Sequence, residues 1–160
     1  MNNLPEKSRL RILIADDASF WRTLLHDFMQ SFGVQEIRGV GSIGHAWETL
    51  QEFRPHMFIC DWQMNDGCGL DLVKRVRHAK DSPNRFINVM MVTSFSEEHR
   101  VHLAMDAGIN GYIAKPFTAG DFLRKFIHCM KDRRPFEVSE SYSGPSRSAQ
   151  LAGAGSSASA

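Results

Sequence analysis

Short apolar runs alternate with longer amphipathic stretches along most of this 160-residue chain. The runs have the composition of buried strands, whereas the stretches repeat their apolar residues every three or four positions, as helices do. Because each strand precedes a helix, the strands can lie parallel, with helices on both faces of one sheet. The alternation therefore predicts an α/β fold built on a doubly wound, five-stranded parallel sheet.

The expected elements follow from where these patterns start and stop. The expected strands cover residues 10–15, 35–40, 57–61, 87–93 and 111–114. The expected helices cover residues 20–32, 43–53, 70–78, 96–107 and 118–132. Ser42, Ser96 and Thr118 stand at the expected helix N-caps, and Gly33 follows the first helix as a C-terminal stop.

Polar side chains stand at the carboxyl ends of four expected strands. Asp16 and Asp17 follow the first strand, and Asp61 closes the third. Thr93 closes the fourth strand, and Lys115 follows the fifth. In open α/β sheets ligands bind at this edge, and clustered carboxylates imply a bound cation because they repel one another. A hydroxyl and an ammonium beside that cation suit a phosphoryl group, so the pattern predicts an aspartate that accepts phosphate.

Composition narrows the functional classes. A net charge of +1 gives no reason to expect DNA binding. No apolar run reaches the roughly 18 residues that cross a bilayer, and the N-terminal residues do not resemble a signal peptide. We therefore expect a cytoplasmic protein that does not bind a membrane. Its three cysteines lack C-x-x-C spacing and are expected to be reduced thiols.

Four segments of the chain resemble the response-regulator receiver family of two-component signalling. They are Ile14-Ala15-Asp16-Asp17, Cys60-Asp61-Trp62-Gln63-Met64 with Gly69-Leu70, Val92-Thr93-Ser94, and Gly111-Tyr112-Ile113-Ala114-Lys115-Pro116-Phe117. The segments occur in the family's order, and the resemblance covers about residues 8–132. It implies a flavodoxin-like (βα)5 fold with strand order 2-1-3-4-5.

The resemblance also implies a magnesium site. Asp17, Asp61 and the backbone carbonyl of Gln63 would bind Mg²⁺ directly, and Asp16 would act through a water molecule. A set of oxygen ligands that retains water is the kind of site that Mg²⁺ prefers.

By the same resemblance, Asp61 becomes 4-aspartylphosphate. It would take the phosphoryl group from a histidine of a sensor histidine kinase or a histidine phosphotransferase. Lys115 would pair with the phosphoryl group, Thr93 would donate a hydrogen bond to it, and the Lys115-Pro116 peptide bond would be cis. The chain is not expected to be an enzyme beyond catalysing its own phosphorylation and dephosphorylation.

A conformational switch and an output surface are implied as well. Thr93 would move toward the phosphate, and the ring of Tyr112 would then turn inward. The output surface for a downstream protein would be the face made by the helix 96–107, the strand around Tyr112 and the helix 118–132.

The chain is expected to divide at about residue 132. Residues 1–132 would form the receiver domain, and residues 133–160 would form a flexible tail rich in Ser, Gly, Ala and Pro, without an output domain. Alternatively, the tail could dock a partner, or a nucleotide second messenger through Arg133, Arg134 and Arg147.

Several functions remain open at this point. The favoured one is a stand-alone receiver that switches a protein-binding surface. Alternatives are a phosphorelay carrier or phosphate sink that passes phosphate to another histidine, and a receiver that no longer takes phosphate. An aspartate-nucleophile phosphohydrolase is disfavoured, because such enzymes carry a second Asp two residues after the nucleophile, where this chain has Gln63.

Overall fold

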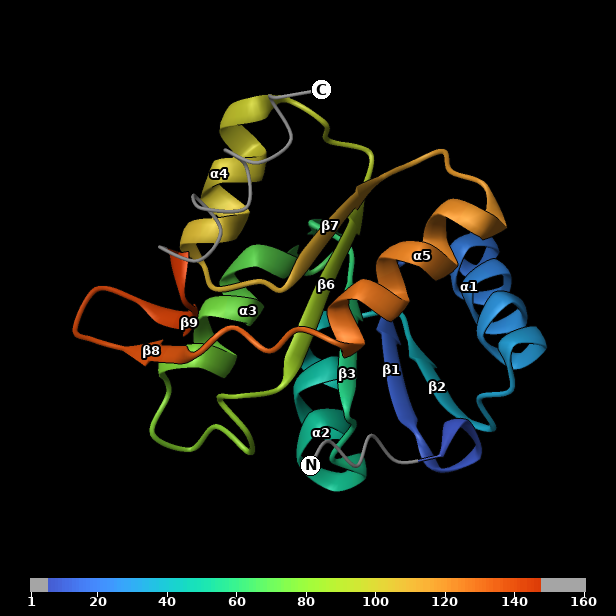
Figure 1. Ribbon diagram of the computed structural model, residues 1–160, viewed down its shortest axis with the longest axis horizontal. Coiled ribbons are helices and arrows are strands. Elements are labelled where there is room, and N and C mark those ends of the chain that lie inside the picture. Colours follow the sequence, from blue (N-terminus) through green and yellow to red (C-terminus); the bar gives the residue numbers. More distant parts are fainter. Residues whose placement is uncertain (1–5, 148–160) are drawn as a thin grey trace.

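The structure, a computed structural model, describes residues 6–147 (Figure 1). Five strands form one parallel sheet in the order β2-β1-β3-β6-β7. They are β1 (Arg11–Ala15), β2 (Glu36–Val40), β3 (Met57–Cys60), β6 (Asn88–Thr93) and β7 (Gly111–Ala114). The predicted order 2-1-3-4-5 is thereby confirmed, since β6 and β7 are the fourth and fifth strands of this sheet.

Helices cover both faces of the sheet (Figure 1). They are α1 (Ser19–Phe32), α2 (Ile43–Phe53), α3 (Gly69–His78), α4 (Glu98–Asp106) and α5 (Ala119–Met130). A short 3-10 turn, Lys7–Arg9, precedes β1, and a small antiparallel pair, β4 (Gln63–Met64) and β5 (Gly67–Cys68), follows β3. Within residues 6–147, no helix has both the length and the apolar character needed to cross a membrane.

Two apolar cores lie on opposite faces of the sheet, because neighbouring residues of a strand point to opposite sides. Ile12 and Ile14 of β1 face α1 and α5, where they pack near Phe122. Leu13 of the same strand faces the other core, to which α2, α3 and α4 contribute. Burial on both faces explains why the central strands read as unbroken apolar runs.

The helix ends largely follow the expected residues. Gly33 adopts a left-handed conformation (φ 108°) at the end of α1. The side chain of Ser42 accepts a hydrogen bond from the His45 N–H, and that of Thr118 accepts one from the Asp121 N–H. The expected cap at Ser96 is wrong, because α4 begins two residues later, after Glu97, and its N-cap makes no side-chain hydrogen bond.

The predicted flexible tail needs correction for residues 133–147. Here the chain forms an antiparallel hairpin of β8 (Phe136–Val138) and β9 (Ser143–Pro145), and β9 packs beside α3. Composition did not predict this, because the buried residues of β9 are small and pack through their backbone rather than through large apolar side chains. Residues 148–160 lie outside the described part of the chain.

Candidate functional site

Adjacent parallel strands bring three carboxylates together at one edge of the sheet. Asp16 and Asp17 follow β1, and Asp61 follows β3, which pairs with β1. The Asp61 N–H donates to the Ala15 carbonyl across that pair (2.9 Å). As a result, one carboxylate oxygen from each of Asp16, Asp17 and Asp61 lies within 4.8 Å of the other two.

Lys115 enters this cluster from the loop after β7. Its Nζ donates to Asp16 Oδ2 at 2.7 Å and to Asp61 Oδ2 at 3.3 Å, and its side chain is only 5% exposed. The backbone N–H of Lys115 donates to the Thr93 carbonyl at 2.8 Å, which fixes the loop to the end of β6. The Lys115-Pro116 peptide bond is cis, as predicted.

Burial and the Lys115 ammonium shift the pKa of Asp61 in opposite directions. Burial raises the pKa of its carboxyl, and the nearby Asp16 carboxylate raises it further, whereas Lys115 lowers it. A hydrogen bond from the Trp62 N–H to Asp61 Oδ1 (2.7 Å) also lowers this pKa. The net direction is upward, so folding makes ionised Asp61 less favourable.

This balance predicts that Asp61→Asn stabilises the metal-free protein at neutral pH. A raised pKa means that the folded chain binds the Asp61 proton more readily than the unfolded chain does. Stability therefore falls as the pH rises through the interval between the ordinary and the raised pKa. We expect a higher Tm for Asp61→Asn in EDTA, with the difference disappearing as the pH falls below the ordinary aspartate pKa.

Asp66→Asn is the matched control, with the opposite sign. The Asp66 carboxylate accepts hydrogen bonds from the Ile43 and Gly44 N–H groups at the start of α2, and these bonds lower its pKa. We expect Asp66→Asn to lower the Tm at neutral pH. A lower Tm for Asp61→Asn in EDTA would contradict the proposed cost of its charge.

A polar crevice of about 430 Å³ opens beside the carboxylates. Its lining residues are Asp17, Asp61, Gln63, Met64, Asn65, Thr93, Ser94 and Phe95. The oxygen-bearing side chains of this lining are two carboxylates, the hydroxyls of Thr93 and Ser94, and the amides of Gln63 and Asn65. Such oxygen donors suit a hard cation such as Mg²⁺. Three convergent carboxylates held by a single ammonium also leave uncompensated negative charge, so the residues present fit such an ion.

The predicted switch residues lie at the side of the crevice. Thr93 is buried, and its Oγ1 accepts a hydrogen bond from the Phe95 N–H at 3.3 Å. The hydroxyl of Tyr112 donates to the Phe95 carbonyl. Burial, followed by the nearby Glu97 carboxylate, raises the pKa of Tyr112 to about 12, so this hydroxyl stays protonated at neutral pH. Thr93 and Tyr112 thus both form hydrogen bonds with the backbone of Phe95, one with its N–H and the other with its carbonyl.

Two residues around the cluster were not predicted to contribute to the site. Lys115 Nζ lies 4.7 Å from the ring centroid of Trp21, and this ring packs against Phe117. Arg22 donates to the backbone carbonyl of Asp16 at 2.6 Å. In the sequence, Trp21 belongs to the apolar repeat of α1, and that spacing does not distinguish a core residue from one that covers a buried ammonium.

Residues 12–127 match the family model of the response regulator receiver domain. The chain is 34% identical over 110 residues to chemotaxis protein CheY1 of Helicobacter pylori, which covers 68% of this chain and 87% of that protein. It is 30% identical over 116 residues to chemotaxis protein CheY-3 of Vibrio cholerae, which covers 72% of this chain and 88% of that protein.

Solved structures support the same fold. The chemotaxis response regulator CheY4 of Vibrio cholerae superposes with a TM-score of 0.69 at 23% identity, covering 75% of this chain and 98% of that chain. The strand order, the carboxylates at the carboxyl edge of the sheet and the family match over residues 12–127 agree with one another. The chain therefore belongs to the response regulator receiver domain family of two-component signalling.

Proposed function

We propose that this chain accepts a phosphoryl group on Asp61 in a Mg²⁺-dependent reaction and thereby switches a protein-binding surface. The observation that carries the proposal is the position of the Asp61 carboxylate, which borders the crevice and lies beside Asp16, Asp17 and Lys115. In the transfer, a bond forms between an Asp61 oxygen and phosphorus as the bond from phosphorus to the donor histidine nitrogen breaks. The donor would be a sensor histidine kinase or a histidine phosphotransferase.

The cation would be held by Asp17, Asp61 and the backbone carbonyl of Gln63, with Asp16 acting through water. When bound, Mg²⁺ would offset the charge that builds up between the carboxylates and the incoming phosphoryl oxygens. The burial of Asp16 (2% exposed) supports its indirect role, because its Oδ1 already accepts from the Ala18 N–H and its Oδ2 from Lys115.

Lys115 would exchange partners during the reaction. Its ammonium now lies between Asp16 and Asp61, an arrangement that compensates two carboxylates when no phosphoryl group is present. A phosphoryl group on Asp61 would bring more negative charge within reach of the same Nζ. The Thr93 hydroxyl would then donate to a phosphoryl oxygen, and its shift would disturb the Phe95 backbone that Tyr112 also holds.

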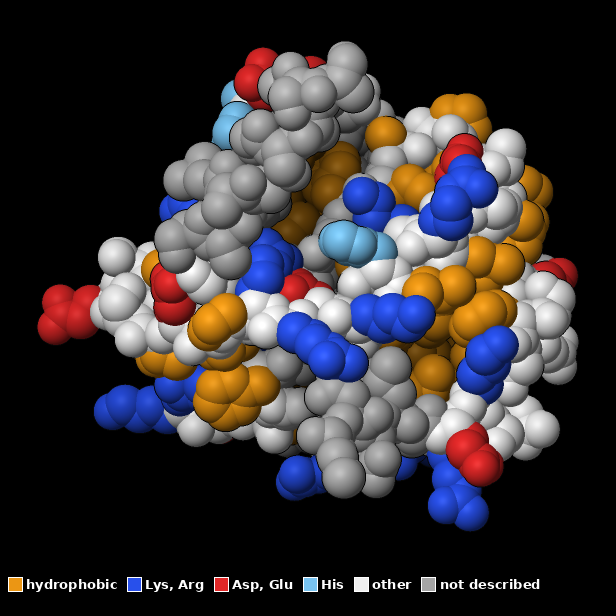
Figure 2. Space-filling view, in the orientation of Figure 1, with side chains coloured by type: hydrophobic (Ala, Val, Ile, Leu, Met, Phe, Trp, Pro, Cys, Tyr) orange, Lys and Arg blue, Asp and Glu red, His pale blue; other side chains and the backbone are white. Residues whose placement is uncertain are grey.

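The proposed output surface comprises α4, β7 and α5. Figure 2 shows basic and histidine side chains gathered over α5 and the segment after it. A groove of about 480 Å³ lies along this surface, lined partly by Phe117, Arg124, Lys125 and His128. Such groups would favour a partner of opposite charge and tune its selection more than the fold's stability.

Lys115→Ala is expected to separate ion binding from signalling. The variant keeps all the proposed Mg²⁺ ligands but loses the ammonium that would contact the phosphoryl group. We expect it to bind Mg²⁺, as measured by titrating tryptophan fluorescence, because Trp62 adjoins Asp61. Phosphorylation should then fail to change hydrogen exchange in α4. A normal α4 response in this variant would contradict the assigned role of Lys115.

Two measurements test the proposed function against its alternatives. Acetyl phosphate should add a phosphoryl group to the protein in Mg²⁺ but not in EDTA, as judged by intact mass. Sustained turnover of p-nitrophenyl phosphate would instead indicate a phosphohydrolase. Passing the label to a histidine phosphotransferase faster than it is lost to water would identify a phosphorelay carrier or sink.

A further inference from the structure

The hairpin after α5 lies against the receiver body through direct backbone contact. We call residues 136–147 the strap. Gly108, which follows α4 with φ 91°, packs so tightly against it that a Cβ there would lie 2.1 Å from the Ser143 carbonyl oxygen. Conversely, a Cβ on Gly144 would lie 2.6 Å from the Gly108 Cα. Because no side chain lies between Gly108 and Gly144, even a small separation of their backbones would break this contact.

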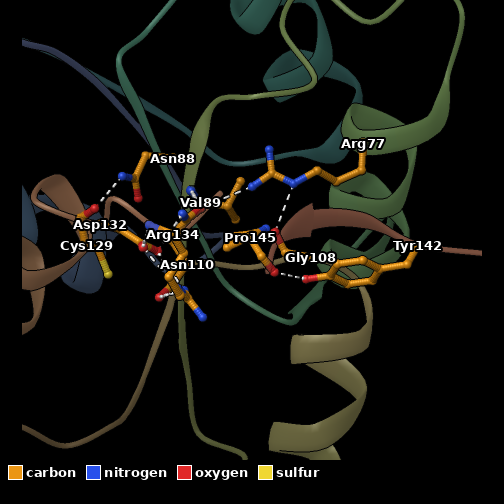
Figure 3. Close-up of polar contacts among 10 residues, drawn as sticks. All are labelled: Arg77, Asn88, Val89, Gly108, Asn110, Cys129, Asp132, Arg134, Tyr142 and Pro145. Atoms are coloured by element: carbon orange, nitrogen blue, oxygen red, sulfur yellow. Dashed lines mark hydrogen bonds and ion pairs between the residues drawn. The ribbon is translucent and has the colours of Figure 1, made fainter. Parts of the chain in front are cut away.

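A buried arginine supports the body's side of this contact (Figure 3). Arg77 of α3 is fully buried and donates to the Gly108 carbonyl at 2.9 Å. It also donates to the carbonyls of Arg85 and Ile87 and to the side chain of Asn110 (3.1 Å). Arg77 therefore fixes Gly108, the residue against which the strap packs.

Further contacts hold the strap along its length. The ring of Phe136 packs edge-on against Phe86, with centroids 4.8 Å apart. Within the strap, the Tyr142 hydroxyl donates to the Pro145 carbonyl at 2.7 Å (Figure 3). Arg147 forms an ion pair with Asp106, the last residue of α4, at 2.5 Å. The strap therefore binds the end of α4 by both backbone and side chain.

Helix α4 itself is only slightly buried. Ala104 is its only buried residue, and Leu103 is 46% exposed. At its other end, the guanidinium of Arg100 lies 3.9 Å from the ring centroid of Phe95, whose backbone is held by Thr93 and Tyr112. Helix α4 thus connects the phosphorylation crevice at its start with the strap at its end.

We infer that strap docking and phosphorylation of Asp61 oppose each other through α4. This inference rests on the proposed function. The docked strap accompanies the arrangement in which Lys115 pairs with Asp16 and Asp61, which is the unphosphorylated one. A displacement of α4 that begins at Phe95 would pull Gly108 away from Gly144. The coupling is reciprocal. If phosphorylation weakens strap docking by a given factor, release of the strap must strengthen phosphoryl-group binding by the same factor.

The first test measures strap docking in the full chain by hydrogen–deuterium exchange over residues 137–146. Beryllofluoride with Mg²⁺ serves as the phosphoryl mimic, and its binding is followed by tryptophan fluorescence. We expect binding to increase strap exchange by about 5-fold or more, the lower end of ordinary coupling between sites. Binding without any change in strap exchange would overturn the inference. Failure of beryllofluoride to bind would instead count against the proposed function.

Two substitutions in the strap should change its docking in opposite directions. Gly144→Ala introduces the clash with Gly108 and should release the strap. Ser143→Ala should tighten docking, because the buried Ser143 hydroxyl has no hydrogen-bond partner among residues 6–147. Glu140→Gln, exposed at the hairpin turn, is the control.

The variants then test reciprocity. Relative to wild type and Glu140→Gln, we expect Gly144→Ala to bind beryllofluoride about 5-fold more tightly. Ser143→Ala should bind it more weakly. Equal beryllofluoride affinity in all four proteins, despite measured differences in strap exchange, would refute the linkage.

Discussion

Replacing Gly69 with alanine is expected to abolish phosphorylation and to destabilise the fold by about 3 kcal/mol. A Cβ at this position would lie 1.8 Å from the backbone oxygen of Asp61 and 2.9 Å from Cys60 Sγ. The Gly69 N–H also donates to the Trp62 carbonyl at 2.6 Å, which ties the start of α3 to the same loop. The methyl group can therefore fit only if the backbone of Asp61 moves.

Urea unfolding and acetyl phosphate labelling would measure both effects. Gly44→Ala is the control, because a Cβ there meets nothing within 4 Å and α2 is a helix. We expect the free energy of unfolding of this control to rise by about 0.5–1 kcal/mol and its phosphorylation by acetyl phosphate to match that of the wild type. If Gly69→Ala unfolds and labels like the wild type, the close approach of α3 to Asp61 does not exist in solution.

Arg77→Met is expected to lower the free energy of unfolding by about 3–4 kcal/mol. The guanidinium is fully buried, and burial lowers its pKa to about 10. It donates to three backbone carbonyls and to the Asn110 side chain. Methionine would remove this donor from the three carbonyls, whereas Asn110 Oδ1 would keep its hydrogen bond from the Val89 N–H. Arg77→Lys should be nearly as destabilising, because one ammonium cannot reach all of these acceptors.

Arg75→Met is the control for this substitution. Arg75 lies two residues earlier on α3, is exposed, and stacks 3.7 Å over the ring of Trp47. Replacing Arg75 with methionine should lower the free energy of unfolding by about 1 kcal/mol or less. Similar urea midpoints for Arg77→Met and Arg75→Met would show that the buried network contributes little to stability.

The sequence predicted the sheet and the charged cluster well, because both depend on local patterns. Apolar periodicity located each strand of the sheet, and the topology of parallel strands then placed Asp16, Asp17 and Asp61 at one edge. Lys115 follows the same logic at the end of β7. The physical reason is that strand register determines where the residues that follow each strand lie.

The buried network and the strap could not be predicted in this way. Arg77 lies in a charged stretch of α3 that resembles a solvated surface, and its partners come from two other segments of the chain, residues 85–87 and 108–110. Ser143 and Gly144 are small residues in a segment whose composition is typical of a flexible tail. Their burial depends on the shape of the backbone around Gly108, which no local pattern reveals.

Asp61 is the proposed phosphoryl acceptor of this receiver domain, and locating the phosphoryl group tests that assignment. Wild type, Asp61→Asn and Asp66→Asn would each be incubated with acetyl phosphate and Mg²⁺ and then examined by intact mass and peptide mapping. We predict a single phosphoryl group in wild type and in Asp66→Asn, located on Asp61, and none in Asp61→Asn. Unchanged labelling of Asp61→Asn, or a phosphoryl group on another residue of the wild type, would contradict this assignment.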